Sequence, residues 1–344
     1  MIDGIETAHI ITSMERVLTQ ATTAIVRCVS LLPLARNGHS LVFDPAGKRG
    51  ILFGGAAGIG AEFRDTWEIR IDSMRRCWFS ELHPRRVAPP ARWGHSAVLR
   101  DAAREMVVFG GCDNGRPQGD VWALRLSRGA EDWRACETSG IGPAPRGGAA
   151  AVYHPGHDSM IIFGGLGTEP FRDTWELKFA TMEWRRLATN GPAPDASVEC
   201  AAVYDAAGDR MLVVTGRDKD LFHSETWALD VSDDRASWDK LLTSGVPPEP
   251  RAGSALGFDE RGRLLYVFGG WSYPPMVFHD DLRVLDVGSL AWRRHDLVGT
   301  KPVGRRLGAM ALDPDSGNLL LFGGENQWRA YIGDAWCMAV QSEP

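Results

Sequence analysis

An arginine recurs at nearly constant intervals along the chain, in most cases two residues before a glycine. The guanidinium group presents a planar fork of donors that suits carboxylates and phosphates. Gathered at one place, such groups would attract an anionic ligand or an acidic peptide. The alternative, which the regular recurrence favours, is that each arginine bonds to the backbone of a neighbouring unit. The arginines concerned are Arg36, Arg92, Arg146, Arg251 and, in the last unit, Arg306 or its neighbour Arg305.

One unit departs from this pattern and brings in a carboxylate. Ser197 stands where the arginine is expected, and Glu199 stands where the glycine is expected. A carboxylate that faces a group of arginines could pair with them, or act as an acid or base with a shifted pKa. Glu199 is therefore the candidate catalytic residue if the protein is an enzyme. The same unit has a highly charged loop that begins at Arg217, which we include among the candidate ligand-binding residues.

Aromatic residues gather in two later loops of the sequence. One loop contains Trp271 and Tyr273, and the other contains Trp328. Exposed rings would suit a planar ligand, a sugar or the anchor residues of a peptide. Alternatively, the rings cover an apolar end of the fold. These three residues complete the set of candidate ligand-binding residues.

The elements that position these residues repeat six times. An apolar run that ends in a Gly-Gly doublet occurs five times, and a degraded copy lacks the first glycine. Equivalent positions are separated by 51 to 56 residues, so the units follow one another without a gap. The copies lie at Ile51–Gly55, Val107–Gly111, Ile161–Gly165, Val213–Gly216, Tyr266–Gly270 and Leu320–Gly324.

Each unit carries further marks in a fixed order. The Arg-x-Gly segment leads into a short run of small and apolar residues, and a turn rich in Asp, Pro and Gly connects that run to the doublet strand. After the doublet come Asp-x-Trp with alternating apolar positions, as at Asp120-Val121-Trp122, and then a trailing Trp, as at Trp133. Alternation with period two indicates strands. Each unit is thus predicted to form four short strands.

The Gly-Gly doublet, Asp-x-Trp and trailing Trp at this spacing resemble the kelch repeat. The resemblance covers about residues 22 to 340. It implies an all-β fold, a six-bladed β-propeller whose Arg-x-Gly strand is innermost. Residues 22–344 are then a single propeller, and residues 1–21 are an N-terminal extension that could form a short helix. The last unit lacks its trailing strand, so the segment Thr23–Val29 is predicted to complete it and close the ring.

Composition excludes several classes of protein. The net charge is −6 with acidic and basic residues mixed throughout, which gives no basic surface for nucleic acid. No run of about 20 apolar residues is present to span a membrane, and the start of the chain does not resemble a signal peptide, so a cytoplasmic location is expected. The six cysteines are scattered without a Cys-x-x-Cys pair. We expect no metal and no cofactor.

Two functions remain. The favoured one is a binding propeller that recognises a protein segment, or a small anionic or aromatic ligand, at the mouth of the channel. The alternative is a cofactor-independent enzyme of the isomerase, cyclase or sugar mutarotase type that uses Glu199 at the same mouth. The propeller fold hosts both, so the choice depends on the shape of the site.

Overall fold

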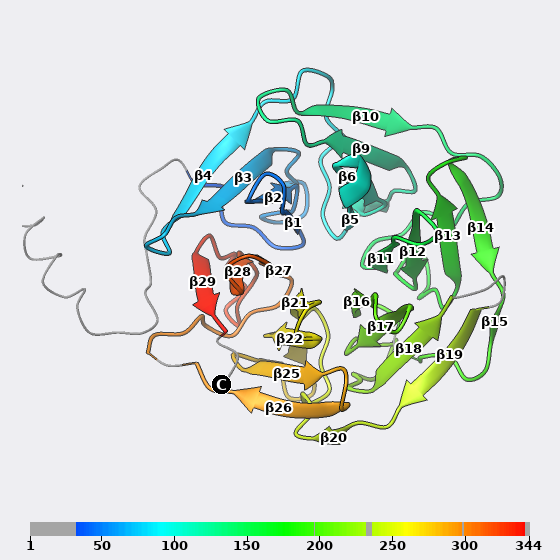
Figure 1. The fold of residues 1–344 in the computed structure, drawn as a ribbon, viewed down its shortest axis with the longest axis vertical. Coiled ribbons are helices and arrows are strands. Elements are labelled where there is room, and N and C mark those ends of the chain that lie inside the picture. Colours follow the sequence, from blue (N-terminus) through cyan, green and yellow to red (C-terminus); the bar gives the residue numbers. More distant parts are fainter. Residues whose placement is uncertain (1–31, 196, 232–235, 298, 341–344) are drawn as a thin grey trace, which may run out of the picture.

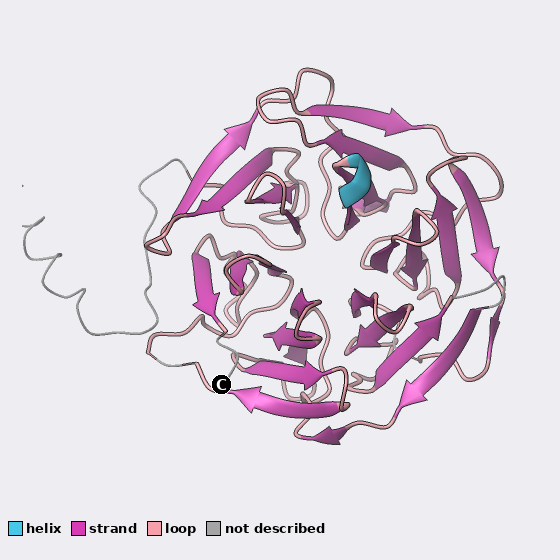
Figure 2. Cartoon of the chain, viewed as in Figure 1, coloured by secondary structure: helices cyan, strands magenta, loops and turns pink. Residues whose placement is uncertain are grey.

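The computed structural model describes residues 32–195, 197–231, 236–297 and 299–340. Six antiparallel sheets stand around a common axis like the blades of a propeller (Figure 1). Figure 2 shows that strands and loops make up almost all of the ring. The predicted all-β, six-bladed propeller is confirmed. Among the described residues, no helix is both long enough and apolar enough to cross a membrane.

The strands of the first three blades run from the axis outward in chain order. Blade 1 contains β1 (Ser40–Asp44), β2 (Arg49–Phe53), β3 (Thr66–Ile71) and β4 (Cys77–Leu82). Blade 2 contains β5 (Ser96–Arg100), β6 (Glu105–Phe109), β9 (Val121–Arg125) and β10 (Asp132–Cys136), with the hairpin β7 (Cys112–Asp113) and β8 (Arg116–Pro117) in a loop. Blade 3 contains β11 (Ala150–His154), β12 (Ser159–Phe163), β13 (Thr174–Lys178) and β14 (Glu183–Leu187).

The next two blades each gain a short fifth strand at the outer edge. Blade 4 contains β16 (Ala201–Asp205), β17 (Arg210–Val214), β18 (Thr226–Asp230) and β19 (Ala236–Leu241), with β15 (Thr189–Asn190) parallel to β19. Blade 5 contains β21 (Ala255–Asp259), β22 (Leu264–Phe268), β25 (Leu282–Asp286) and β26 (Ala291–His295), with β20 (Ser244–Gly245) parallel to β26. The hairpin β23 (Trp271–Ser272) and β24 (Val277–Phe278) lies in a loop of blade 5.

Blade 6 has three strands within the described residues: β27 (Ala309–Leu312), β28 (Asn318–Phe322) and β29 (Ala335–Ala339). The predicted closing strand Thr23–Val29, and the extension over residues 1–21, lie outside the described residues. Blades 6 and 1 are nevertheless joined through the backbone, because Arg36 N–H donates to the Ile332 carbonyl at 3.1 Å and Gly324 N–H donates to the Arg36 carbonyl at 2.8 Å. These bonds close the ring at its inner edge.

Apolar side chains fill the spaces between neighbouring blades. The second strand of a blade is buried on both faces, as in β12, where all five residues are buried. The trailing Trp of one blade packs on the doublet-strand Phe of the blade before it: Trp133 lies 4.8 Å from Phe53, and Trp238 lies 4.7 Å from Phe163, between ring centroids. Each sheet thus buries its faces against its neighbours and not within itself.

The first blade corrects one detail of the predicted pattern. Trp78 occupies the place of the trailing Trp in the sequence of this blade, but it is 44% exposed. Phe79 is the residue that faces inward. It pairs with Ile69 of the neighbouring strand, just as the buried Trp133 pairs with Leu124 in blade 2. Phe79 is buried and lies 5.5 Å from the Phe322 ring of blade 6. The strand alternation, and not the identity of the aromatic residue, decides which side chain enters the core.

Ion pairs join the blades at the end of the channel where the first turn of each blade lies. The last residue of an inner strand meets a turn residue of the next blade with opposite charge. Asp44 binds Arg104 at 3.1 Å, Arg100 binds Asp158, and Asp205 binds Arg263 at 2.7 Å. The sign of the charge differs from joint to joint. These pairs therefore fasten neighbouring blades to one another at this end of the channel.

The Asp205–Arg263 pair gives a test of this role. Arg263→Ala leaves the buried Asp205 carboxylate with Arg210 at 3.1 Å, so the free energy of unfolding should fall by about 1–2 kcal/mol. The measurement is urea denaturation, combined with Asp205→Asn in a double-mutant cycle. The matched control is Arg261→Ala, since Arg261 is exposed in the same turn. Equal stability of the Arg263→Ala and Arg261→Ala variants would contradict the proposed role.

Candidate functional site

A closed circuit of backbone hydrogen bonds surrounds one end of the channel, which we call the mouth. Its six members, the mouth belt, each donate their N–H to the belt carbonyl of the preceding blade, over 2.7 to 3.0 Å. All six have φ between +52° and +65°, a conformation that favours glycine. The members are Gly38, Gly94, Gly148, Glu199, Gly253 and Leu307.

The repeat arginines lie just behind the mouth belt and not on its surface. Arg36 donates to both carboxylate oxygens of Asp65, at 2.6 and 2.8 Å, and to the Gly54 carbonyl at 2.9 Å. Although burial alone would raise the pKa of Asp65, hydrogen bonds from Arg36 lower it below its ordinary value. We call this arrangement, an arginine bound to an aspartate and to a doublet carbonyl of its own blade, the clasp. It recurs in four other blades, where at most 1% of each arginine is exposed. It joins Arg92 to Asp120, Arg146 to Asp173, Arg251 to Asp281 and Arg305 to Asp334.

This clasp settles which of the predicted arginines are available to a ligand. The donors of Arg36, Arg92, Arg146 and Arg251 are occupied by a doublet carbonyl and by an aspartate of the same blade, which in the first three of these blades is the aspartate of Asp-x-Trp. They hold each blade together and do not line the mouth. The sequence contains the signal for this pairing, because the fourth unit loses both partners at once: Ser197 replaces the arginine and Glu225 replaces the aspartate.

Glu199 lies in the mouth belt and holds two other predicted residues. Its carboxylate accepts a hydrogen bond from Trp271 Nε1 at 2.9 Å and lies 3.6 Å from Arg217 Nη2. Glu199 and Arg217 belong to blade 4, whereas Trp271 belongs to blade 5. The structure thus brings Glu199, Arg217 and Trp271 together at one side of the mouth. Their polar atoms bind one another.

Arg306 extends this network toward blade 1. It is not the repeat arginine of its blade, which is Arg305, but the residue after it. Its guanidinium lies 4.7 Å from the Trp271 ring and binds Glu325 at 3.0 Å. Asn37 donates to the same Glu325 carboxylate at 3.0 Å. A connected chain of polar contacts therefore runs over blades 1, 6, 5 and 4, and sequence reasoning missed Glu325 and Asn37 as its members.

The predicted aromatic residues divide into two kinds. Trp271 is half-buried between Arg306 and the edge of Phe222, 4.8 Å away, so it supports the mouth and does not project from it. Tyr273 and Trp328 project outward, with 60% and 73% of their surface exposed. They lie in loops of adjacent blades at the mouth end. Met276 in the loop of Tyr273 is also exposed, at 48%.

The channel opens inside the belt with a small cavity and continues inward into a second cavity of about 240 Å³. The cavity inside the belt measures about 140 Å³ and is lined by belt residues and those that follow them, among them His39 and His95. Burial, with Arg36 nearby, lowers the pKa of His39 to about 3, and burial likewise lowers the pKa of His95. Both rings are therefore neutral at physiological pH. His95 Nε2 lies 2.8 Å from Ser40 Oγ of the neighbouring blade, a contact that joins two blades.

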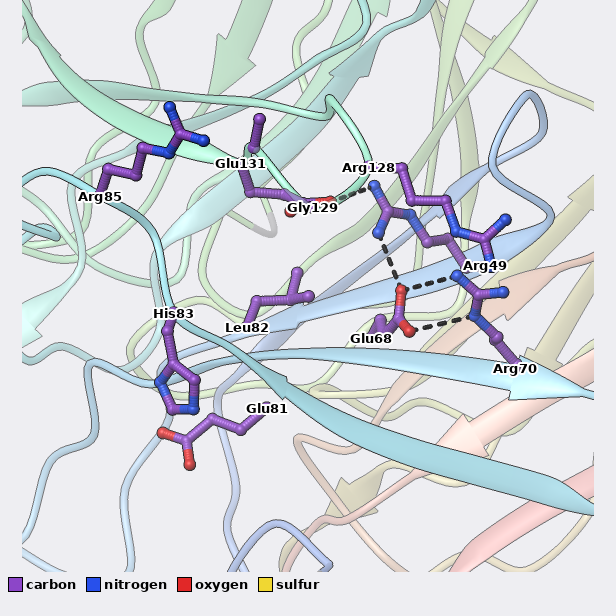
Figure 3. A pocket seen from close by; sticks show the side chains of 11 residues that line it. Arg49, Glu68, Arg70, Glu81, Leu82, His83, Arg85, Arg128, Gly129 and Glu131 are labelled. Carbon is purple, nitrogen blue, oxygen red and sulfur yellow. Dashed lines mark hydrogen bonds and ion pairs between the residues drawn. The ribbon is translucent and has the colours of Figure 1, made fainter.

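A larger hollow, of about 540 Å³, lies between blades 1 and 2 near the outer edge (Figure 3). Arg49 forms its inner wall and is 1% exposed, because it binds Glu68 at 2.8 Å and Glu131 of the next blade at 2.8 Å. Arg70 also turns to Glu68, at 3.1 Å. These buried groups neutralise one another. They fasten two blades together, as the ion pairs at the turns do.

Comparison with known proteins accounts for the repeating parts of this site. The family model for the KLHDC2/KLHL20/DRC7 Kelch-repeats domain matches residues 13–203 and 130–324. The chain belongs to the kelch-repeat family. A kelch propeller supports a role in binding or interaction in general. The clasp recurs in five of the six blades, whereas glutamate occupies the belt position in blade 4 alone.

Individual relatives resemble the kelch chain over most of its length. A flagellar outer-arm dynein alpha chain from Chlamydomonas reinhardtii is 28% identical over 88% of this chain. An F-box/kelch-repeat protein from Arabidopsis thaliana is 28% identical over 69% of it. The chain spans only 7% and 55% of these two relatives. The solved structure of YjhT covers 91% of this chain and 97% of its own, with a TM-score of 0.67 and 16% identity, which shows the shared fold.

The doublet glycines allow a matched test of the close approach between blades. A Cβ on Gly110 would lie 2.6 Å from the Arg146 carbonyl oxygen, whereas a Cβ on Gly115 would have no atom within 4 Å. Both have positive φ, +68° and +73°. Gly115→Ala should lower the free energy of unfolding by about 1–2 kcal/mol from backbone strain alone. Gly110→Ala should lower it by about 1–3 kcal/mol more. Equal losses in urea denaturation would contradict the account.

Proposed function

We propose that this kelch propeller holds a segment of a partner protein across the mouth, over the loops of blades 5 and 6. The observation that carries the proposal is the exposure of Tyr273 and Trp328 on adjacent blades, together with that of Met276 in the loop of Tyr273. Large rings that are exposed in the free protein and held on short loops of a rigid scaffold are typical anchors for a partner. The blades supply that rigid scaffold.

The small volume of the cavity inside the belt supports a protein partner over a small molecule held at the belt. Sites that enclose a small ligand commonly measure about 300–1,000 Å³, whereas the cavity inside the belt measures about 140 Å³. A ligand there would rest on the loops and would not be enclosed. A broad surface with projecting anchors suits an extended segment, which gains affinity from contact over its length.

The charges near the anchors indicate the chemistry of that segment. Arg329 follows Trp328 at the loop tip and is exposed, and Arg306 keeps part of its guanidinium accessible beside Glu325. Apolar side chains of the partner would pack on Tyr273 and Trp328. An acidic residue next to them would meet Arg329. We therefore propose that the partner segment is apolar and carries at least one acidic residue. Such a segment agrees with the anionic or aromatic ligand that the sequence predicts at this mouth.

The surroundings of Glu199 support a catalytic function less well than a binding function, within the residues that the structure describes. Glu199, the candidate acid or base, is bound by Trp271 and lies beside Arg217. The space in front of it is the belt cavity of about 140 Å³. A catalytic carboxylate needs an enclosed position for the substrate within hydrogen-bond reach. We therefore propose that Glu199 serves to hold Trp271, which in turn lies against Arg306.

A peptide selection tests the proposal directly. Random peptides displayed on phage are selected against the immobilised propeller, and the enriched sequences are synthesised and measured by fluorescence polarisation. We expect apolar sequences with an acidic residue, and we expect Trp328→Ala and Tyr273→Ala each to weaken their binding by about tenfold or more. The physical reason is the loss of exposed ring surface that the partner would bury.

The matched control is Trp78→Ala, because Trp78 is also an exposed Trp, 44% exposed, but lies on the outer strand of blade 1. This variant should bind the selected peptides as the unmodified protein does. Peptides that bind the Trp328→Ala and Tyr273→Ala variants as tightly as the unmodified protein would contradict the proposed site. Equal weakening by Trp78→Ala would also contradict it.

A further inference from the structure

A second and larger cavity occupies the end of the channel opposite the mouth. It measures about 650 Å³ and is lined by residues of all six blades, from the inner strands and the turns that follow them. The inner strands β1, β5, β11, β16, β21 and β27 face one another around it (Figure 1). Its volume lies within the range of about 300–1,000 Å³ that is typical of small-molecule sites. Size alone therefore distinguishes this end of the channel from the mouth.

The wall of this cavity is a ring of large apolar side chains, one from each blade. They occupy the same position in each inner strand, five residues after the belt residue, and all are half-buried. Four of the six are aromatic. The ring consists of Phe43, Leu99, Tyr153, Tyr204, Phe258 and Leu312. Half-buried rings that surround an open space are the arrangement that attracts organic cations, since each ring face carries partial negative charge.

Carboxylates accept hydrogen bonds from two tyrosines of the ring, and one of these carboxylates, Asp158, is also paired with Arg100. Tyr153 donates its hydroxyl to Asp158 at 3.0 Å, and Tyr204 donates its hydroxyl to Asp209. Both phenols are thus held as donors, and burial together with these carboxylates raises the pKa of each tyrosine. The rings of both tyrosines lie at the cavity wall, while their hydroxyls point toward the two aspartates. An anionic ligand would meet no free donor from these two tyrosines.

The rim of the cavity carries an excess of acidic residues. Asp101, Asp259 and Glu260 line it, against one arginine, Arg261. Asp101 and Glu260 are exposed on turns of blades 2 and 5. Cations that approach this end of the channel are thus attracted first by the rim and then by the aromatic ring. The mouth, in contrast, exposes Arg329 beside its aromatic anchors.

We propose that this end of the channel is a binding site for a small organic ammonium ligand with an apolar body. The apolar body packs on the six side chains of the ring, and the ammonium group lies between the aromatic faces and the rim carboxylates. A quaternary or tertiary ammonium fits best, because it has little to lose by leaving water. The site is separate from the mouth, so a partner segment and this ligand could be bound at the same time.

Three probes with one aromatic body test the charge preference. They are (1-naphthylmethyl)trimethylammonium, 1-naphthalenemethanol and 1-naphthylacetate, each titrated into the full chain by calorimetry at low ionic strength. The ammonium probe should bind at least about tenfold more tightly than the acetate. The alcohol should lie between them. Absence of binding by the ammonium probe, or equal affinities for the three probes, would overturn the proposal.

Substitutions on exposed turns locate the site without disturbing the core. Ala206 is exposed and lines the cavity, whereas its neighbour Ala207 is exposed and does not line it. Ala206→Trp should obstruct the entrance and weaken the ammonium probe by about tenfold or more, whereas Ala207→Trp should leave its affinity unchanged. Equal effects of the two variants would place the probe elsewhere and overturn the proposed location.

Charge reversal at the rim tests the contribution of the carboxylates. The double variant Asp101→Lys with Glu260→Lys should weaken the ammonium probe by about fivefold or more and strengthen the acetate. Glu137→Lys, at an exposed position in the loop between β10 and β11, reverses one charge away from the cavity, and the single variant Glu260→Lys is its matched partner at the rim. An ammonium affinity that is the same in the rim variant and in Glu137→Lys would contradict the electrostatic part of the proposal.

Discussion

The mouth belt is the constraint on which the rest of the site depends. Six backbone hydrogen bonds pass from blade to blade and return to their starting point, so every blade is fixed relative to both neighbours at the innermost radius. The bonds require a positive φ at each belt residue, which is why glycine occupies four of the six positions. Because the circuit is closed, a shift of one blade would strain bonds on both sides. The loops that rise from the belt therefore have fixed relative positions.

The proposed binding site lies where the repeat is broken. Glu199 and Leu307 carry side chains at belt positions that are glycine elsewhere, and Glu199 uses its carboxylate to hold Trp271 of the next blade. Arg306 and Glu325 continue the contacts across blade 6. This network gives one side of the mouth a rigid base, from which Tyr273 and Trp328 project. Blades 1 to 3 offer no equivalent pair of exposed rings at this end within the described residues.

Repetition made the fold predictable, because the same residue types recur wherever the same geometry recurs. The direction in which each side chain points was harder to predict. The sequence placed Arg36 and its equivalents near the mouth, but only the clasp with Asp65 shows that their donors point into the blade. Trp78 and Phe79 adjoin in sequence, and strand register alone decides which of them is buried. The exposure of Trp271 was equally hard to predict, because the sequence alone does not show that Arg306 and Phe222 pack against its ring.

The larger cavity at the opposite end was missed for a different reason. Phe43, Tyr153 and their equivalents lie in runs that fit the alternation of a buried strand. Burial between blades and exposure to the channel give the same apolar pattern in such a strand, so the pattern does not separate them. Only the radius of the ring, set by six blades closing on one belt, determines that these side chains surround an open space and do not fill it.

Native-state hydrogen exchange of the belt amides tests the central claim most directly. If the belt is a closed circuit, the six belt amides should open together, with the protection of global unfolding, although they lie near the surface of the mouth. The amides of Asp220 and Trp328, which bond only to side chains within their own loops, should exchange much faster. Belt amides that exchange independently of one another, or as fast as those two loop amides, would contradict the account.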